Sequence, residues 1–233
     1  MTIPIEKLIN YVSIVLNLIH RQEWTQLEKV ISEQKLFKLI SEHIHKCDEF
    51  NGMTLLHAVA RLNPPVRILD AMIDADCDAV KGQDCVGRLP LHVACGSRAD
   101  GLIINRLVKA YPQACDIQDV DGKVPLHFAC DTKCVLFEDD QTPLAPPTID
   151  IVKVLLSGSM QSVLAEDDDE MNPIEYAVVS GLDVKIVKLL RKARMSVRRK
   201  DASLRRKDAS ANKSNEQDNK TLPVLRRSIL AYC

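Results

Sequence analysis

Apolar residues recur along this chain every three or four positions, which is the spacing of amphipathic helices. The first twenty residues hold one such series on a single helical face, namely Ile5, Leu8, Ile9, Val12, Leu16 and Ile19. We expect a helix there and not a secretory signal, because no basic cluster precedes the series and no small-residue cleavage site follows it. No stretch of 18 uncharged apolar residues exists, so the sequence predicts no membrane-spanning helix.

The pattern repeats after 35 residues. The segments 54–57, 89–92 and 124–127 end in histidines 35 residues apart, and a glycine precedes each histidine by five residues. After each of the first two histidines, apolar residues stand at offsets of 12, 15 and 16: Leu69, Met72, Ile73, Ile104, Leu107 and Val108. Each unit is therefore predicted to hold two helices, the second packing its apolar stripe on the first and on the neighbouring unit.

The third unit carries an insert, and a fourth unit is degenerate. The apolar triplet reappears as Val152, Leu155 and Leu156, thirteen residues later than expected. The extra residues lie within about 131–148, where several prolines and aspartates predict a loop. In the fourth unit the motif becomes Asn172-Pro173-Ile174-Glu175, with Glu175 in the histidine place, Glu170 in the glycine place, and Val187 and Leu190 continuing the second helix.

The motif also predicts how its helices begin. Pro90, Pro125 and Pro173 suit the first helical position, where no N–H is needed and φ is already set. Thr54 and Asn172 precede their helices and are predicted N-caps. The second and third units have apolar residues at that place, so they are predicted to lose a cap worth roughly 1 kcal/mol each. The glycines predict tight turns with positive φ.

The motif Gly-x-x-Pro-Leu-His-x-Ala-Cys, followed by a second helix, resembles the ankyrin repeat over about residues 47–192. The 35-residue unit and the preceding segment around Trp24 resemble ankyrin arrays common in unicellular algae such as diatoms. The resemblance implies an all-α solenoid of stacked helix-turn-helix units with β-turn fingers. We therefore expect a helical N-terminal cap (1–46), an array (47–193) and a basic C-terminal tail, disordered or partly helical (194–233). The array units are placed at about 49–83, 84–118, 119–167 (with the insert 131–148) and 168–193.

The same resemblance implies a non-enzymatic module that binds a protein partner of unknown identity. Contact would be made by the fingers and by the concave face of the first helices, and we expect a monomer in the cytoplasm or nucleus. The candidate partner-binding residues are Phe50, Asn51, Met53, Arg61, Cys85, Val86, Arg88, Ser97, Arg98, Val120, Asp121, Lys123 and Asp131. The motif residues with an implied structural role are Gly52, Thr54, His57, Gly87, Pro90, His92, Gly122, Pro125 and His127.

Other chemistry is weakly indicated. His92 and Cys95, like His127 and Cys130, have the i, i+3 spacing of zinc ligands, but they repeat at structural positions. The acidic run 167–170 lacks the turn glycine and alternating ligands of a calcium loop. No phosphate loop, Gly-x-Ser-x-Gly elbow or His-Glu-x-x-His motif occurs. We expect no catalytic residues, no metal and no cofactor.

Charge and composition add a second hypothesis. The eight cysteines form no paired CxxC pattern, which favours a reduced compartment, and the low aromatic content of 4% favours helices packed through aliphatic residues. Residues 1–184 carry a net charge of −12 and residues 185–233 a net charge of +11. The alternative function is a basic-tail binder of nucleic acid or anionic membrane through residues 191–207, with the repeats as scaffold. Docking of the tail on the acidic body is a further alternative.

The tail holds a tandem heptad, Arg-Arg-Lys-Asp-Ala-Ser at 198–203 and again at 205–210. Ser203 and Ser210 are candidate phosphorylation sites, because added phosphate would neutralise the basic patch. Arg191-Lys192 followed by the second basic triplet resembles a bipartite nuclear-import signal. The apolar segment 222–233 is predicted to cover the open end of the array.

Overall fold

The computed structural model describes residues 4–137 and 144–220. In these ranges the chain forms helices and no β-strand, so the all-α prediction is confirmed. The chain divides into two compact units, Met1–Ala193 and Arg194–Cys233. The α-helices are α1 Ile5–His20, α2 Trp24–Ser32, α3 Gln34–Lys46, α4 Leu55–Arg61, α5 Val66–Ala75, α6 Pro90–Gly96, α7 Gly101–Ala110, α8 Pro125–Cys130, α9 Ile149–Gly158, α10 Pro173–Val179 and α11 Val184–Lys220. The 3-10 helices are η1 Asp48–Phe50, η2 Ala79–Lys81, η3 Pro112–Asp116 and η4 Gln161–Leu164.

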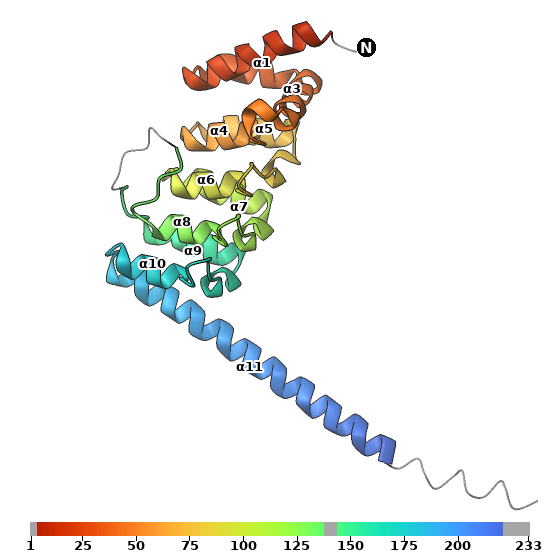
Figure 1. Cartoon of the computed structure of the whole chain (residues 1–233), viewed down its shortest axis with the longest axis vertical. Coiled ribbons are helices and arrows are strands. Elements are labelled where there is room, and N and C mark those ends of the chain that lie inside the picture. The colour runs from red at the N-terminus through yellow and green to blue at the C-terminus, as the bar shows by residue number, and fades with distance from the viewer. Residues whose placement is uncertain (1–3, 138–143, 221–233) are drawn as a thin grey trace, which may run out of the picture. The chain divides into compact units, whose positions relative to one another are not determined.

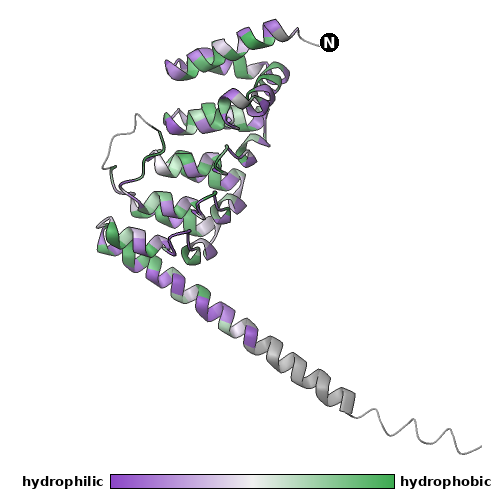
Figure 2. Cartoon of the chain, in the orientation of Figure 1, coloured by the Kyte–Doolittle hydropathy of each residue, from purple (hydrophilic) through white to green (hydrophobic). Residues whose placement is uncertain are grey.

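The first unit is built from short helices that stack in sequence (Figure 1). Helix α4 packs on α6, α6 on α8 and α8 on α10, while α5, α7 and α9 form a second layer in the same order. The predicted apolar triplets of α5, α7 and α9 are all buried. Apolar and polar residues alternate along these helices because only one face of each helix packs on its neighbours (Figure 2). Ala94, Ala129 and Ala177 are fully buried at the centres of α6, α8 and α10, where a small side chain lets neighbouring helices approach closely.

Helices α1, α2 and α3 pack on one another, and α2 and α3 also contact α5. The predicted N-terminal helix is confirmed, but its buried face differs from the prediction. Val12, Val15 and Ile19 are buried, whereas Ile9 is 52% exposed. Helices α2 and α3 pack on the side of α1 that carries Val15, so this residue is buried although the sequence pattern did not include it.

The local predictions about helix starts and turns are confirmed at most positions. Pro90, Pro125 and Pro173 each begin their helix, and the glycines at 52, 87 and 122 have φ values of 72°, 76° and 76°. Glu170, in the glycine place of the fourth unit, also has a positive φ of 59°. The described part of the insert, residues 131–137 and 144–148, holds no helix, as predicted.

The second unit contains the C-terminal part of α11, which continues as helix to Lys220. The described part of the predicted tail, residues 194–220, lies within this helix. Ser203 Oγ donates a hydrogen bond to the carbonyl of Lys200, while the side chain of Ser210 and the segment 222–233 lie outside the described residues. No helix in the described part of the chain is long and apolar enough to cross a bilayer.

Candidate functional site

The turns that connect successive layers share one internal bracing device. Asp84 Oδ1 accepts hydrogen bonds from the amides of Val86 (3.1 Å) and Arg88 (2.8 Å), which lie two and four residues later. Asp119 and Asp167 make the same pair of bonds within their own turns. These carboxylates fix the turn backbone, and sequence reasoning missed them. An aspartate three residues before the turn glycine was the available signal.

The turns are also joined to one another by backbone hydrogen bonds. The amides of Cys85, Val120 and Asp168 donate to the carbonyls of Asn51, Val86 and Asp121 at 2.7, 2.9 and 3.0 Å. We call residues 50–53, 85–88, 120–123 and 168–171 together the finger row. Because three of the four turns are braced by an aspartate and all four are tied to a neighbour, the side chains of the finger row project from an ordered backbone.

The three motif histidines lie beneath the finger row and join its turns to the helices. His57 Nδ1 accepts from the amide of Thr54 (2.9 Å), and its Nε2 lies 2.9 Å from the carbonyl of Arg88 in the next turn. An amide only donates and a carbonyl only accepts, so the ring is neutral with its proton on Nε2. His92 and His127 make the same two kinds of contact, Nδ1 to the amides of Leu89 and Val124 and Nε2 to carbonyls of the following turn.

The predicted loss of a side-chain N-cap is confirmed for the second and third units, since neither Leu89 nor Val124 caps its helix through its side chain. The apolar residues Leu89 and Val124 at the starts of α6 and α8 have their amides capped by the histidine rings, both at 3.0 Å. The hydroxyl of Thr54 contacts His57 Nδ1 (2.9 Å) and the carbonyl of Ala79 (3.4 Å). Asn172 caps α10 as predicted, since its Oδ1 accepts from two helix amides and Glu175 accepts from the amide of Asn172. Here Glu175 does the work of the histidine.

Burial lowers the pKa of these histidines. The pKa of His57 falls to about 4 and that of His92 to about 3, and the pKa of His127 is also lowered. Burial also raises the pKa of the nearby Cys130 thiol to about 12. With both ring nitrogens bonded to backbone, the histidines serve structure, and no group of three or more metal-ligating side chains gathers in the described ranges.

Six of the candidate partner-binding residues come together at one cavity of about 440 Å³. They come from the second and third turns and from the end of α8, and they are Val86, Arg88, Val120, Asp121, Lys123 and Asp131. The opposite wall comes from the insert, residues 133–136, and Phe128 also lines the cavity. Val120 is 61% exposed, while Arg88 pairs with the buried Asp84 at 2.8 Å and Lys123 Nζ lies 5.6 Å from the ring centroid of Tyr176.

The remaining candidates lie elsewhere. Phe50, Asn51 and Met53 belong to the first turn and do not line this cavity, and the exposed Cys85 lies outside its lining. Ser97 Oγ is buried without a hydrogen-bond partner. Two basic residues turn toward other parts of the chain: Arg98 donates to the carbonyls of Cys95, Phe128, Asp131 and Ala145, and the Arg61 guanidinium lies 4.1 Å from the ring centroid of Phe137.

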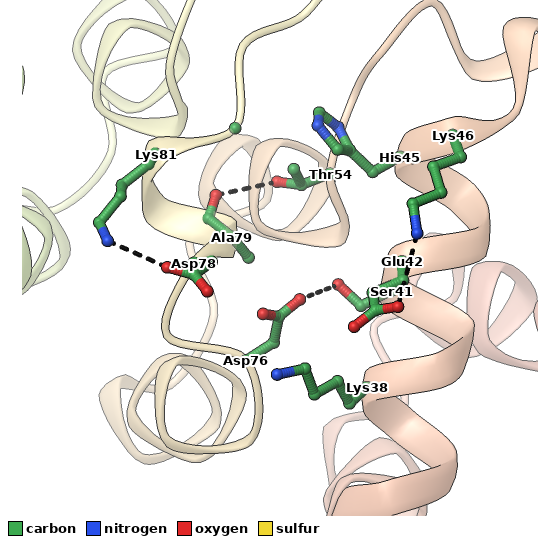
Figure 3. Close-up of a pocket in the computed structure, with 11 residues that line it drawn as sticks. Lys38, Ser41, Glu42, His45, Lys46, Thr54, Asp76, Asp78, Ala79 and Lys81 are labelled. Carbon is green, nitrogen blue, oxygen red and sulfur yellow. Dashed lines mark hydrogen bonds and ion pairs between the residues drawn. The ribbon is translucent and has the colours of Figure 1, made fainter.

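A second cavity, of about 260 Å³, lies between α3 and η2 (Figure 3). Its polar groups bond to one another: Ser41 donates to Asp76 (2.7 Å), Lys46 lies 3.6 Å from Glu42, and Lys81 pairs with Asp78 (3.0 Å). Lys38 also lines the cavity. The cavity lies where α3 meets residues 76–82, so no local sequence signal could have predicted it.

The finger-row cavity therefore combines aliphatic, basic and acidic side chains on a fixed backbone and holds no catalytic constellation in its lining. Comparison with known proteins adds no assignment, since the sequence matches no protein-family model and no curated protein is similar to it.

Proposed function

We propose that residues 47–193 form an ankyrin-repeat solenoid that binds a protein partner, without catalysis, in the cytoplasm or nucleus. Support for the solenoid comes from the 35-residue recurrence of the motif together with the recurrence of its hydrogen bonds. The binding surface is the finger row with the adjoining ends of the first helices. The observation that carries the proposal is the cavity at which six predicted residues from two turns and α8 converge.

The physical argument rests on preorganisation. Docking on turns that are already ordered costs less conformational entropy than docking on a loop that becomes ordered only on binding. The exposed Val120 supplies an apolar contact, and Lys123, Arg88 and Asp121 supply charged groups around it. This mixture of an apolar centre and a polar rim is typical of protein interfaces. The neutral histidines and the raised pKa of Cys130 disfavour a nucleophilic role for the motif residues.

The test is capture of partners from the source cells by the full chain and by two matched double variants. Val120→Asp with Lys123→Glu changes the finger row, and Leu102→Asp with Lys109→Glu makes the same two changes on exposed positions of α7. We expect the finger-row variant to lose its partner at least tenfold relative to the α7 variant, because only the former places new charge in the interface. Equal capture by both variants would contradict the proposal.

One observation favours the alternative of a basic-tail binder. Helix α11 continues without interruption through both basic triplets, 198–200 and 205–207, which are two helical turns apart. Binding of DNA fragments or anionic vesicles through this helix should fall steeply with salt and should vanish when the second triplet is changed to glutamine. Partner capture that persists at high salt in this variant would assign the function to the finger row.

A further inference from the structure

The insert is a loop closed at its base. The amide of Leu144 donates to the carbonyl of Thr132 at 2.8 Å, which brings the two ends of the segment together. Arg98, two residues after the end of α6, holds the same base, since its guanidinium donates to the carbonyls of Asp131 and Ala145. We call residues 131–137 the strap.

The strap places two neighbouring side chains on the first-helix layer. Leu136 lies against Gly96 at the end of α6, so closely that a Cβ atom there would stand 2.4 Å from Leu136 Cδ1. The positions 35 residues before and after Gly96 hold Arg61 and Asp131, so this layer alone has the space. The glycine is therefore what admits the leucine side chain.

The next residue of the strap lies near two cations. The Phe137 ring centroid is 4.1 Å from the Arg61 guanidinium carbon and 5.8 Å from that of Arg88. Guanidinium groups at these distances attract the ring face. We call Arg61, Arg88 and Gly96 the seat. Two of its three residues are among the predicted partner-binding residues, so the strap covers part of the surface assigned to the partner.

The contact is shallow. Leu136 and Phe137 both remain partly exposed, and Val135 beside them is 60% exposed. A side chain that is only half-buried contributes part of the free energy that full burial would give. The strap is thus anchored at its base, while Leu136 and Phe137 keep part of their surface exposed at the seat, where another chain can reach them.

We propose that the seat is a binding site for an extended partner segment carrying an aliphatic residue followed by an aromatic one, and that the strap fills it in cis until such a segment displaces it. The proposal rests on the function proposed above and names the chemistry of the partner. The pair Leu136-Phe137 is the internal copy of that chemistry: Gly96 accommodates the aliphatic side chain, and the two arginines select the aromatic ring.

The test measures binding of a labelled peptide, Thr-Lys-Ser-Val-Leu-Phe, which copies strap residues 132–137 with serine for cysteine. The full chain is compared with a full-chain variant, Leu136→Ser with Phe137→Ser, in which the seat is vacated. We expect the variant to bind the peptide at least about tenfold more tightly, because a tethered strap competes at an effective concentration on the order of millimolar. A peptide with Ser-Ser in place of Leu-Phe should not bind.

Two further variants exclude trivial explanations. Arg61→Gln added to the vacated variant should abolish peptide binding, while Lys109→Glu added to it should not. Circular dichroism of each protein establishes that it is folded. Because the vacated variant changes only two partly exposed side chains, we expect its melting curve to stay close to that of the unaltered chain. Equal peptide affinity for the unaltered and vacated chains, or no binding to a folded vacated chain, would overturn the proposal.

The two proposals fail separately. If the finger-row variant loses its cellular partner but the vacated chain gains no peptide binding, the seat is wrong and the binding function stands. If the vacated chain binds the peptide but partner capture ignores the finger row, the seat stands as a peptide site and the broader binding function is wrong.

Discussion

Glu170 occupies a backbone conformation that the equivalent turns reserve for glycine. Its φ of 59° is the left-handed region, which costs a residue with a Cβ atom roughly 1–2 kcal/mol relative to right-handed conformations. The sequence placed Glu170 in the glycine position, and the structure shows that the turn keeps its shape there. The turn is held by Asp167, which braces it as Asp84 and Asp119 brace theirs.

Replacing Glu170 by glycine should therefore stabilise the protein by about 1 kcal/mol, because the strain is relieved. Glu170→Ala keeps the strained φ and should change stability little. Gly122→Ala should be destabilising, since its Cβ would lie 3.0 Å from Asp167 Cα. Urea midpoints of the three variants measure the effect. A Glu170→Gly protein no more stable than Glu170→Ala would show that this turn stores no strain.

The buried histidines predict acid sensitivity. Their folded pKa values, about 4 for His57 and about 3 for His92, lie below the value near 6.5 of an unfolded chain. The unfolded state thus binds protons first, so the stabilising contribution is complete above pH 6.5 and is lost as the pH falls toward the folded pKa. Each histidine should remove about 1.4 kcal/mol per pH unit in that window. The urea midpoint between pH 7.5 and 5 measures this, and a flat profile would contradict the assignment.

Particular residues show how far the sequence could be interpreted at this scale. The proline and glycine positions were predictable, because proline fixes its own φ and glycine adopts a positive φ without strain. The hydrogen bonds from the amides of Leu89 and Val124 to the histidine rings were not predicted. The capping rule concerns the side chain of the residue before the helix, whereas these bonds are accepted by a ring three residues later. For the finger-row cavity, the sequence predicted a set of partner-binding residues but not that six of them line one cavity.

At the scale of elements, the insert was predicted only in part. Its prolines and aspartates predicted a loop, and the length of the extra segment gave its place. That Leu136 and Phe137 return to α6 could not be predicted, because this depends on the space at Gly96 and on two arginines far away in sequence. The N-terminal helix shows the same limit, since its neighbours decide that Val15 and not Ile9 is buried.

The base of the strap makes a stability prediction. Arg98→Ala removes hydrogen bonds to four carbonyls, and we expect a loss of about 2–3 kcal/mol because these groups are partly buried. Tryptic cleavage at Lys133 should accelerate in the same variant. Arg67→Ala is a matched control, since this arginine makes one exposed ion pair with Glu28. If the two variants are equally stable, Arg98 does not hold the strap.

At the scale of the whole molecule, the main helix packing of the first unit runs between neighbouring layers. The inner helices are covered on both sides and the outer ones on one side. Amide hydrogen exchange should therefore be slowest in α6 and α8 and fastest in α1. Mass spectrometry of peptic fragments measures this order, and α1 peptides protected as strongly as those of α6 would contradict it.

The layers are joined along the stack by the bonds of the finger row and by the histidine contacts beneath it. A force that pulls along the stack acts on each of these layer-to-layer junctions in turn. If the ends of the first unit were drawn apart, each junction would bear the full load, and the weakest would separate before its neighbours. The first unit would then lengthen under tension in steps of one layer.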